Sequence, residues 1–420
     1  MANVDWQATY YLMRESLINH AKTSFNDVAI FDWPKIISYS AAGRYRMADL
    51  FKPVAMAGVT QTSRQFSRHD PLLGFIVLLM GITTLNLNHH DYRSVILSVL
   101  MLFVLGNLWL LCRESTQSIA WHELRKFIIQ FGLYITISGF AFHWLNQVLT
   151  LPTWLKFMLG DLLWGYAANQ NRLFGSAYNP NDACCLLLIA LGLLLTQLSH
   201  GSVHPFTRWP LINWFLVGLL CVGIYQTKSR TGLMIMIAIL IMTTYQLCRH
   251  HRILVTTILI AGSLVVWHVF PRSASTITAL QSRLTIWHNS FTVFKQAPYL
   301  GVTYFGFARH YLQLTGTYVP HAHDILLMLL ASFGILGGAG FIYLVLSSGW
   351  HLTKYWHQYR TPNLRYFMMT LPIILAYGLT DFVLSSMQVL IIILLIIACW
   401  HHEQQLRPII SPRKYQSPLI

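Results

Sequence analysis

The amino-acid sequence predicts an all-α, polytopic transmembrane helical bundle with about ten spanning helices and twelve as the upper bound. Hydrophobic residues make up 55% of the 420-residue chain and charged residues only 10%, against roughly 25% charged residues in soluble globular domains. Apolar runs of about twenty residues recur along the chain, and a helix of that length crosses a hydrocarbon core of about 30 Å. Because lipid offers no hydrogen-bond partners, helices that satisfy their own backbone groups are the expected spanning structure.

Each apolar run between polar residues predicts one span. The predicted spans cover residues 71–89, 92–112, 125–145, 180–198, 210–227, 231–248, 252–270, 324–348, 366–381 and 383–400. Only Asp381 and Phe382 separate the last two. Residues 71–400 therefore form the predicted transmembrane domain, between an N-terminal segment at 1–70, which is either cytoplasmic or on the membrane surface, and a cytoplasmic tail at 401–420.

The distribution of basic residues predicts the orientation. Twenty of the 29 Lys and Arg residues fall in the segments on the N-terminal side of the membrane and nine on the other side, so the positive-inside rule places both termini in the cytoplasm. Two long loops, at 146–179 and 271–323, are then extracytoplasmic. The second is rich in aromatic residues and predicts short helices on the outer surface, and a cysteine at Ser290 is expected to react with an impermeant thiol reagent from outside.

The formal charge of +15 does not indicate nucleic acid, because the basic residues lie between the apolar runs and do not form one arm or soluble domain. The six cysteines have no metal-binding or disulfide spacing and fall in or at the ends of apolar runs, which predicts simple packing. No metal ion or other cofactor is expected.

Some outer basic residues escape the inward bias and are candidate anion-binding positions. Arg230 lies in the turn Lys228-Ser229-Arg230-Thr231-Gly232 between two apolar runs, at the membrane boundary. A guanidinium group binds phosphate in bidentate fashion, and the diphosphate of a lipid carrier would lie at this depth; snorkelling to the interface is the competing interpretation. Lys228, Arg172, Arg272, Arg283 and Arg309 suit the same interpretation, although headgroup anchoring explains any single one of them.

His321-Ala322-His323-Asp324 follows Pro320 and begins a long apolar run, which predicts a helix N-terminus favourable to an anion. A histidine here can be neutral near pH 7 and take a proton from an attacking hydroxyl group. Interfacial polar capping is the alternative, and no metal site is predicted because no further carboxylate or histidine stands out in the outer loops. Asn179 begins another span as an ordinary turn and cap signal.

Six short motifs follow one another between residues 179 and 345. They are Asn179-Pro180-Asn181, Ser229-Arg230-Thr231-Gly232, Arg283-Leu284-Thr285-Ile286-Trp287, Pro298-Tyr299-Leu300-Gly301, His321-Ala322-His323-Asp324 and Phe333-Gly334-Ile335-Leu336-Gly337. Their order and their placement on one side of the membrane resemble the O-antigen ligase and polymerase superfamily of bacterial membrane glycosyltransferases. The chain departs from the usual motif at Asp324, where the family has Asn.

The resemblance implies a GT-C-like fold in the bacterial cytoplasmic membrane with an extracytoplasmic active site. Such enzymes transfer glycan from an undecaprenyl-diphosphate donor to a glycan or lipid-linked acceptor, inverting the anomeric centre and using neither metal nor nucleotide sugar. Arg230 and Arg283 would hold the diphosphate and His323 would be the general base. Assistance in substrate binding would come from Arg172, Lys228, Arg309, His321, Asp324 and Asn179.

The sequence leaves several functions open. A polymerase of repeat units for a capsule, exopolysaccharide or O-antigen-like glycan is the first choice, and a ligase that delivers finished glycan to a lipid, wall or protein acceptor is the second. Other polysaccharide-assembly membrane proteins would be partners. A secondary transporter or flippase is the alternative from another class, but the centres of the apolar runs carry few ionisable residues, unlike typical transporters.

Overall fold

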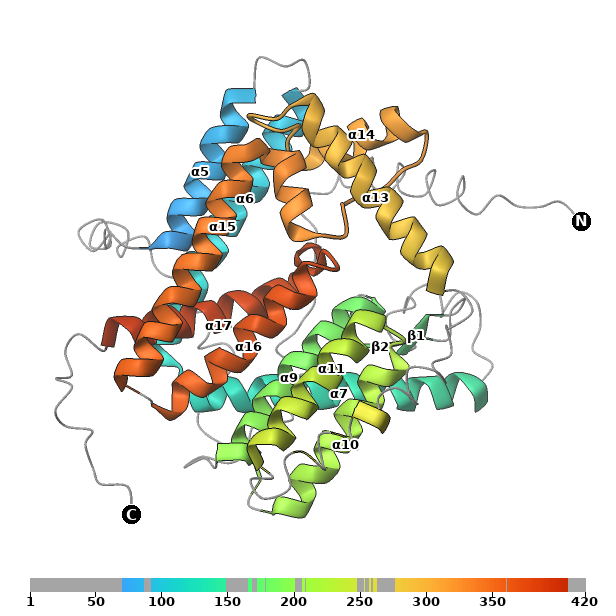
Figure 1. The fold of residues 1–420 in the computed structure, drawn as a ribbon, viewed down its shortest axis with the longest axis vertical. Helices are drawn as coiled ribbons and strands as arrows, with labels where there is room; N and C mark the ends of the chain where they lie inside the picture. The colour runs from blue at the N-terminus through green and yellow to red at the C-terminus, as the bar shows by residue number, and fades with distance from the viewer. Residues whose placement is uncertain are drawn as a thin grey trace, which may run out of the picture. The chain divides into compact units, whose positions relative to one another are not determined.

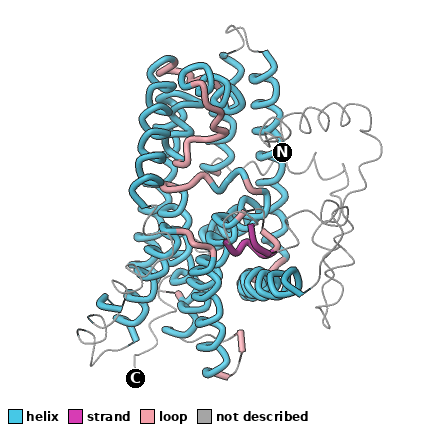
Figure 2. The backbone as a smooth tube through the Cα atoms, turned by 90° about the vertical axis from the view of Figure 1, so that its right-hand side faces the viewer, coloured by secondary structure: helices cyan, strands magenta, loops and turns pink. Residues whose placement is uncertain are grey.

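Helices form nearly all of the structure, as the apolar runs predict (Figures 1 and 2). The computed structural model describes residues 70–86, 92–148, 165–167, 172–177, 179–200, 206–207, 209–247, 253, 257, 260–262, 276–359 and 361–406, all of which belong to the unit His69–Ile420. The predicted N-terminal segment up to residue 69, most of the predicted span 252–270 and the tail from 407 lie outside the described residues.

The apolar helices lie close to the predicted spans. They are α5 (Pro71–Leu85), α6 (Tyr92–Ser118), α7 (Trp121–Val148), α9 (Pro180–His200), α10 (Pro210–Gln226), α11 (Arg230–Leu247), α15 (Ile325–Tyr359), α16 (Pro362–Gly378) and α17 (Met387–Leu406). Six of them, α6, α7, α9, α11, α15 and α17, are long and apolar enough to cross a membrane, and α5 and α10 are shorter apolar helices. The chain is therefore a helical integral membrane protein, while the total of about ten spans stays a prediction.

Helices α6 and α15 are among those that continue beyond the ends that hydropathy predicts. Helix α6 extends past residue 112, where Arg113 forms an ion pair of 3.0 Å with the buried carboxylate of Asp70. Helix α15 extends past residue 348, where Leu352 is only 8% exposed and the ring of Tyr355 lies 5.9 Å from that of Trp400 in α17. Contacts with neighbouring helices, which hydropathy does not register, extend both elements.

The break between the last two helices is longer than the two residues predicted. Helix α16 ends at Gly378 and α17 begins at Met387, and a short 3-10 helix, η4 (Val383–Ser385), lies between them. Asp381 stabilises this irregular segment because its Oδ1 atom accepts a hydrogen bond of 3.0 Å from the backbone N–H of Phe382. The segment 379–386 thus holds a buried carboxylate outside any helix.

The two predicted loops differ in content. The second contains α13 (Thr276–Gln296) and α14 (Tyr304–Thr315), which pack against α15; α13 has 21 residues and is longer than the short helix expected. In the described part of the first loop, β1 (Gly165–Ala167) and β2 (Arg172–Gly175) form an antiparallel pair, drawn in magenta in Figure 2.

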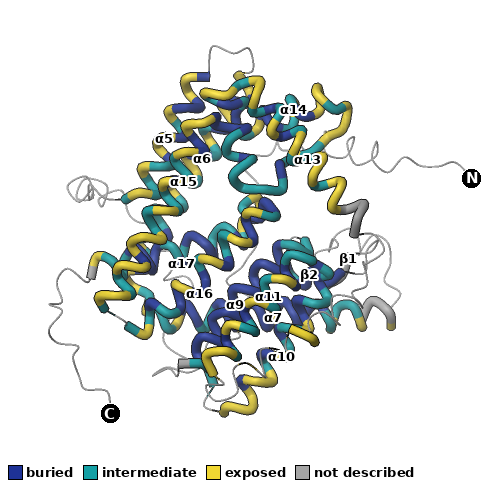
Figure 3. Tube along the Cα trace, in the orientation of Figure 1, coloured by how far each residue is buried: buried dark blue, intermediate teal, exposed yellow. Residues whose placement is uncertain are grey.

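Helix α9 forms the centre of the main core and is almost entirely buried (Figure 3). It packs against α7, α10, α11 and α16. Small residues allow the closest approaches: a Cβ atom on Gly232 of α11 would lie 2.0 Å from Cys184 Sγ of α9. The beginnings of α9 and α11 are therefore held side by side, and with them two of the motifs found in the sequence.

Helix directions alternate, so that several helix ends meet on one face, called here the site face. It comprises the beginnings of α9, α11 and α15, the end of α16 and the segment between α16 and α17, which are joined by the hydrogen bonds described below. The N-terminal end of α5 lies away from this face, where Asp70 Oδ2 accepts hydrogen bonds from Trp109 and Arg113 near the end of α6.

The fold corrects the residue chosen for testing orientation. Ser290 is fully buried and donates a hydrogen bond of 2.7 Å to the Ile286 carbonyl oxygen, so a thiol there would not react. We expect Gln296→Cys, at an exposed position on α13, to be labelled by an impermeant maleimide in intact cells. Glu123→Cys, whose side chain is 53% exposed at the start of α7, should be labelled only after lysis, and the reverse pattern would contradict the predicted orientation.

Candidate functional site

Tyr377 connects three of the helix ends on the site face. It lies at the end of α16 and its side chain is fully buried. Its Oη atom lies 3.1 Å from Ser229 Oγ, just before α11, and donates a hydrogen bond of 3.0 Å to the carbonyl oxygen of Asn181 in α9. Through this hydroxyl group, the motifs at 179–181 and 229–232 are held in fixed positions relative to each other.

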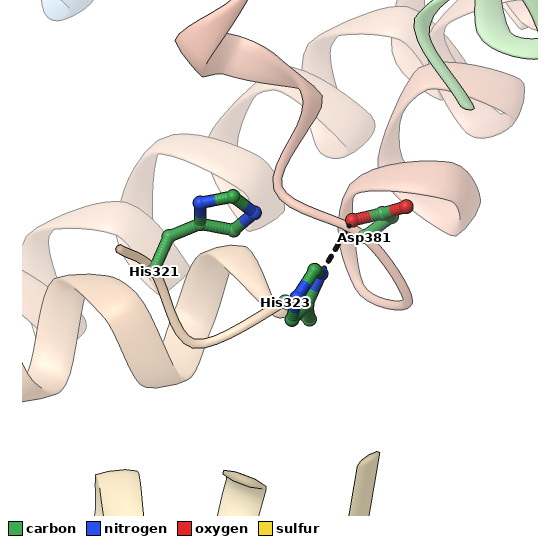
Figure 4. A group of neighbouring side chains, drawn as sticks. All are labelled: His321, His323 and Asp381. Carbon is green, nitrogen blue, oxygen red and sulfur yellow. Dashed lines mark hydrogen bonds and ion pairs between the residues drawn. The ribbon is translucent and has the colours of Figure 1, made fainter. Parts of the chain in front are cut away.

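His323 contacts Asp381 across the site face (Figure 4). The Nδ1 atom of His323, in the turn before α15, lies 2.9 Å from Oδ1 of Asp381, in the segment between α16 and α17. An ionised carboxylate can only accept a hydrogen bond, so Nδ1 carries a proton, and in the neutral ring the lone pair is on Nε2. The imidazole ring is therefore in the form that can take a proton at Nε2.

The backbone of His323 is in the left-handed region, with a φ of 54°. Few non-glycine residues adopt this conformation, although His, Asn and Asp do so more readily than others. Two neighbours restrain it: Ala322 is fully buried, and Asp324 Oδ1 accepts a hydrogen bond of 2.7 Å from Leu327 N–H, which caps the start of α15. The turn thus directs the His323 ring toward Asp381.

Arg283 reaches the same segment from α13. Its guanidinium group donates a hydrogen bond of 3.0 Å to the Thr380 carbonyl oxygen and lies 3.8 Å from Asp381 Oδ2. The side chain of Arg283 is 34% exposed, whereas that of Asp381 is 6% exposed. The guanidinium group therefore contacts the carboxylate and still presents part of its surface to a ligand.

Asn181 and Arg172 continue the hydrogen-bond network from the Oδ2 atom of Asp381. The side-chain amide of Asn181 donates a hydrogen bond to Asp381 Oδ2, and its Oδ1 atom accepts one of 2.7 Å from Arg172. Arg172, buried at the start of β2, also donates a hydrogen bond of 2.7 Å to the carbonyl oxygen of Thr227. These contacts connect the turn before α11 with His323 through one chain of hydrogen bonds.

The surroundings of Asp381 keep it charged. Burial raises the pKa of this carboxyl group, but the hydrogen bond from His323 and the charge of Arg283 outweigh burial, so that the pKa is lowered overall. For His321, burial and the neighbouring His323 lower the pKa to about 4. At neutral pH the site therefore holds an ionised Asp381 and a neutral His321.

The side chains of two predicted substrate-binding residues cap the starts of helices. Asn179 Oδ1 accepts hydrogen bonds of 2.8 and 3.1 Å from the backbone N–H groups of Asn181 and Asp182 at the start of α9. Asp324 caps α15, and burial raises the pKa of its carboxyl group. The carboxylate that contacts His323 is Asp381 and not the adjacent Asp324.

The remaining predicted site residues lie at helix starts, in turns or on the surface of a helix. Arg230 is the first residue of α11, directly after Ser229, and Lys228 precedes them with a φ of 52°. His321 lies in the turn with His323, the two ring centroids being 4.5 Å apart. Arg309 occupies an exposed position on α14. Hydrogen bonds and an ion pair thus connect Arg172, Arg283 and His323 through Asn181 and Asp381. Lys228 and Arg230 come shortly after Thr227, whose carbonyl oxygen accepts a hydrogen bond from Arg172.

Two glycine-containing motifs position α13 and α14 against α15. The helix α15 is interrupted at Gly334, whose φ is 65°, and Gly301 opposite has a φ of 68°. A Cβ atom on Gly334 would lie 2.2 Å from the Tyr299 carbonyl oxygen, so only glycine allows this approach. Backbone hydrogen bonds join 298–303 to 331–335, including Val302 N–H to the Ala331 carbonyl oxygen at 2.9 Å. This packing fixes the element that carries Arg283 relative to the turn that carries His323.

One group of side chains has the composition of a metal site. His321, His323 and Asp381 each offer one ligand atom, and these atoms lie within 4.8 Å of one another. The sequence predicts no metal site because no further carboxylate stands out in the predicted outer loops. Asp381 comes instead from the segment between α16 and α17.

We expect Tyr377→Phe to lower stability, because it leaves the Asn181 carbonyl oxygen and the Ser229 hydroxyl group without this buried partner. An unsatisfied buried polar group costs about 1–3 kcal/mol. Thermal unfolding of the purified protein in detergent should show a transition lower by several degrees. The control Tyr343→Phe removes a hydroxyl group from a residue that is 70% exposed and should melt like the wild type; equal transitions for both variants would contradict the role given to Tyr377.

Comparison with known proteins gives one family. Residues 215–342 match the family described as O-antigen ligase, and a search of curated proteins found no match. The matched region includes five of the six motifs recognised in the sequence, among them those of Arg230, Arg283 and His323. Asn181, Tyr377 and Asp381, which complete the site, lie outside it.

The resemblance seen in the motifs is therefore confirmed over residues 215–342, and this match supports a membrane activity of the ligase or polymerase type.

Proposed function

We propose that this chain is an extracytoplasmic glycosyltransferase of the bacterial cytoplasmic membrane that polymerises undecaprenyl-diphosphate-linked repeat units of a cell-surface polysaccharide. Transfer of a finished glycan to a lipid, wall or protein acceptor is the alternative within the same class. The observation that carries the proposal is the His323–Asp381 pair with Arg283 beside it, because a base and a cation meet there at the ends of membrane helices.

Arg230 and Arg283 are assigned to the donor diphosphate. The beginnings of α9, α11 and α15 lie on the site face, and the positive ends of their helix dipoles favour an anion there. Guanidinium groups bind phosphate oxygens in pairs and offset the charge that grows on the leaving group. Lys228, Arg309 and Arg172 would assist, Arg172 by holding the turn at Thr227 in position.

His323 is assigned as the general base. The acceptor hydroxyl oxygen attacks the anomeric carbon and forms the new glycosidic bond while the bond from that carbon to the diphosphate oxygen breaks. The hydroxyl proton moves to Nε2 of His323, and the electron pair of the broken bond stays on undecaprenyl diphosphate. A single displacement of this kind inverts the anomeric configuration. Asp381 stabilises the imidazolium that forms, because its ionised carboxylate accepts the hydrogen bond from Nδ1. The mechanism as proposed requires no metal ion.

Purified protein reconstituted with an undecaprenyl-diphosphate-linked repeat unit tests the proposal. A polymerase releases undecaprenyl diphosphate and forms a ladder of lengthened lipid-linked glycans, whereas a ligase releases it only when a separate acceptor is added. A transporter or flippase would move the donor across a vesicle membrane with no release, and that result would overturn the proposal.

A further inference from the structure

We propose that His321, His323 and Asp381 also form a binding site for a transition-metal ion such as Zn²⁺, and that metal bound there inhibits the enzyme. Binding is argued from the geometry of these three residues alone. The inhibition rests on the proposed function, because it requires His323 to be the general base.

The ligand set and its spacing suit such an ion. Two imidazole groups and one carboxylate are ligands that Zn²⁺ and similar divalent metals accept. The three ligand atoms lie within 4.8 Å of one another, while donor atoms around a tetrahedral zinc ion at about 2.0–2.1 Å are separated by roughly 3.3 Å. Small side-chain rotations would close that difference. Figure 4 shows the two rings on one turn, with the carboxylate beside them.

The neighbours of Asp381 indicate how the ion would be held. Its Oδ2 atom is engaged by Asn181 and lies 3.8 Å from Arg283, whereas Oδ1 faces His323 and Phe382 N–H. The ion would therefore bind at Oδ1. The side chain of His323 is 29% exposed, which leaves room for a water molecule as a further ligand. Because Arg283 disfavours a second positive charge, we expect reversible binding weaker than that of a structural zinc site.

Metal at this position would remove the general base whichever ring nitrogen it binds. If it binds Nε2 of His323, it occupies the lone pair that would accept the acceptor's proton. If it binds Nδ1, the ring proton shifts to Nε2, which then becomes a donor and accepts no proton. Both arrangements stop proton transfer, so the metal acts as an inhibitor and not as a cofactor.

Direct binding tests the site. Metal-free full-length protein in detergent is titrated with Zn²⁺ by calorimetry and with Co²⁺ by visible absorption, where nitrogen and oxygen ligands give d–d bands. We expect one ion per chain and, in His321→Ala, His323→Asn and Asp381→Asn, a loss of affinity of at least about tenfold. The matched control His288→Ala, at an exposed histidine on α13, should bind as the wild type does. No binding, or binding retained in all three site variants, would overturn the proposal.

Inhibition is measured separately from binding. In the reconstituted transfer assay, Zn²⁺ should reduce the rate at concentrations that match its measured affinity, and EDTA should restore it. His321→Ala should shift the inhibitory concentration upward at least about tenfold, whatever its basal rate. A rate that rises with Zn²⁺ would overturn the inhibitory role. Zinc binding without any transferase activity would contradict the proposed function alone, and transferase activity that is indifferent to bound Zn²⁺ would overturn the inhibitory role.

Discussion

Replacing His323 with Asn is expected to reduce glycan transfer by about 10²–10⁴-fold, the usual contribution of a general base. Asn has no nitrogen that accepts a proton near neutral pH, so the acceptor hydroxyl group would have to attack unassisted. Asn is preferred to Ala because His323 has a φ of 54°, which Asn adopts more readily. The measurement is the rate of lipid-linked glycan elongation in proteoliposomes at saturating donor.

Two controls accompany this variant. The change His288→Asn makes the same substitution on the exposed face of α13 and should leave the rate unchanged. The thermal transition of His323→Asn should lie within a few degrees of the wild type, which shows that insertion and packing are intact. A folded His323→Asn protein with more than about half the wild-type rate would contradict the role of His323 as general base.

Replacing Asp381 with Asn is expected to reduce kcat on the order of 10³-fold, because the amide can donate a hydrogen bond to Nδ1 of His323. The ring then carries its proton on Nε2 and no longer acts as a base. The change also removes the ion pair with Arg283, the two atoms of which are 3.8 Å apart. We expect the KM for the donor to change by only a few-fold, since Asp381 acts by positioning His323 and not by binding substrate.

The split between kcat and KM separates this role from a loss of stability. The control Asp70→Asn removes a buried carboxylate that pairs with Arg113 at 3.0 Å, near the end of α6. It should lower the thermal transition while leaving kcat close to the wild-type value. If Asp381→Asn instead behaved like Asp70→Asn, Asp381 would be a structural residue only.

The sequence predicts the helices well because spanning segments follow one physical rule, the cost of exposing backbone groups and polar side chains to lipid. Its errors occur where packing, not hydropathy, determines the helix end. Leu352 and Tyr355 extend α15 beyond the apolar run because they contact neighbouring helices. Hydropathy also places the last break at two residues, whereas the polar contacts of Asp381 hold open a longer segment.

The site is only partly predictable for a different reason. His323, Arg283 and Arg230 could be selected as candidates because basic residues and histidines at outer helix ends are unusual, and their roles stay predictions. Asp381 could not be paired with His323 from a single sequence, since 58 residues separate them. A usable signal was present: Asp381 is a lone carboxylate between two long apolar runs, where a buried charge requires a partner.

Asn179 and Asp324 show that a residue in a motif can have a local structural role. The resemblance implies a substrate-binding role for both, which stays a prediction, and both accept backbone hydrogen bonds at helix starts. Asn and Asp are the residues preferred for helix N-caps, so their presence in a motif is compatible with a purely local role. A sequence motif identifies the segment that must be conformationally defined, but not which of its side chains contacts the ligand.

The most direct test of the proposed function is the release of undecaprenyl diphosphate from a lipid-linked repeat unit by the purified protein in EDTA-containing buffer. We predict that the wild type releases it as glycan is transferred and that His323→Asn does so at least about 10²-fold more slowly. Absence of release by folded wild-type protein supplied with donor and acceptor, or equal release by the two proteins, would contradict a glycosyltransferase that uses the His323–Asp381 pair.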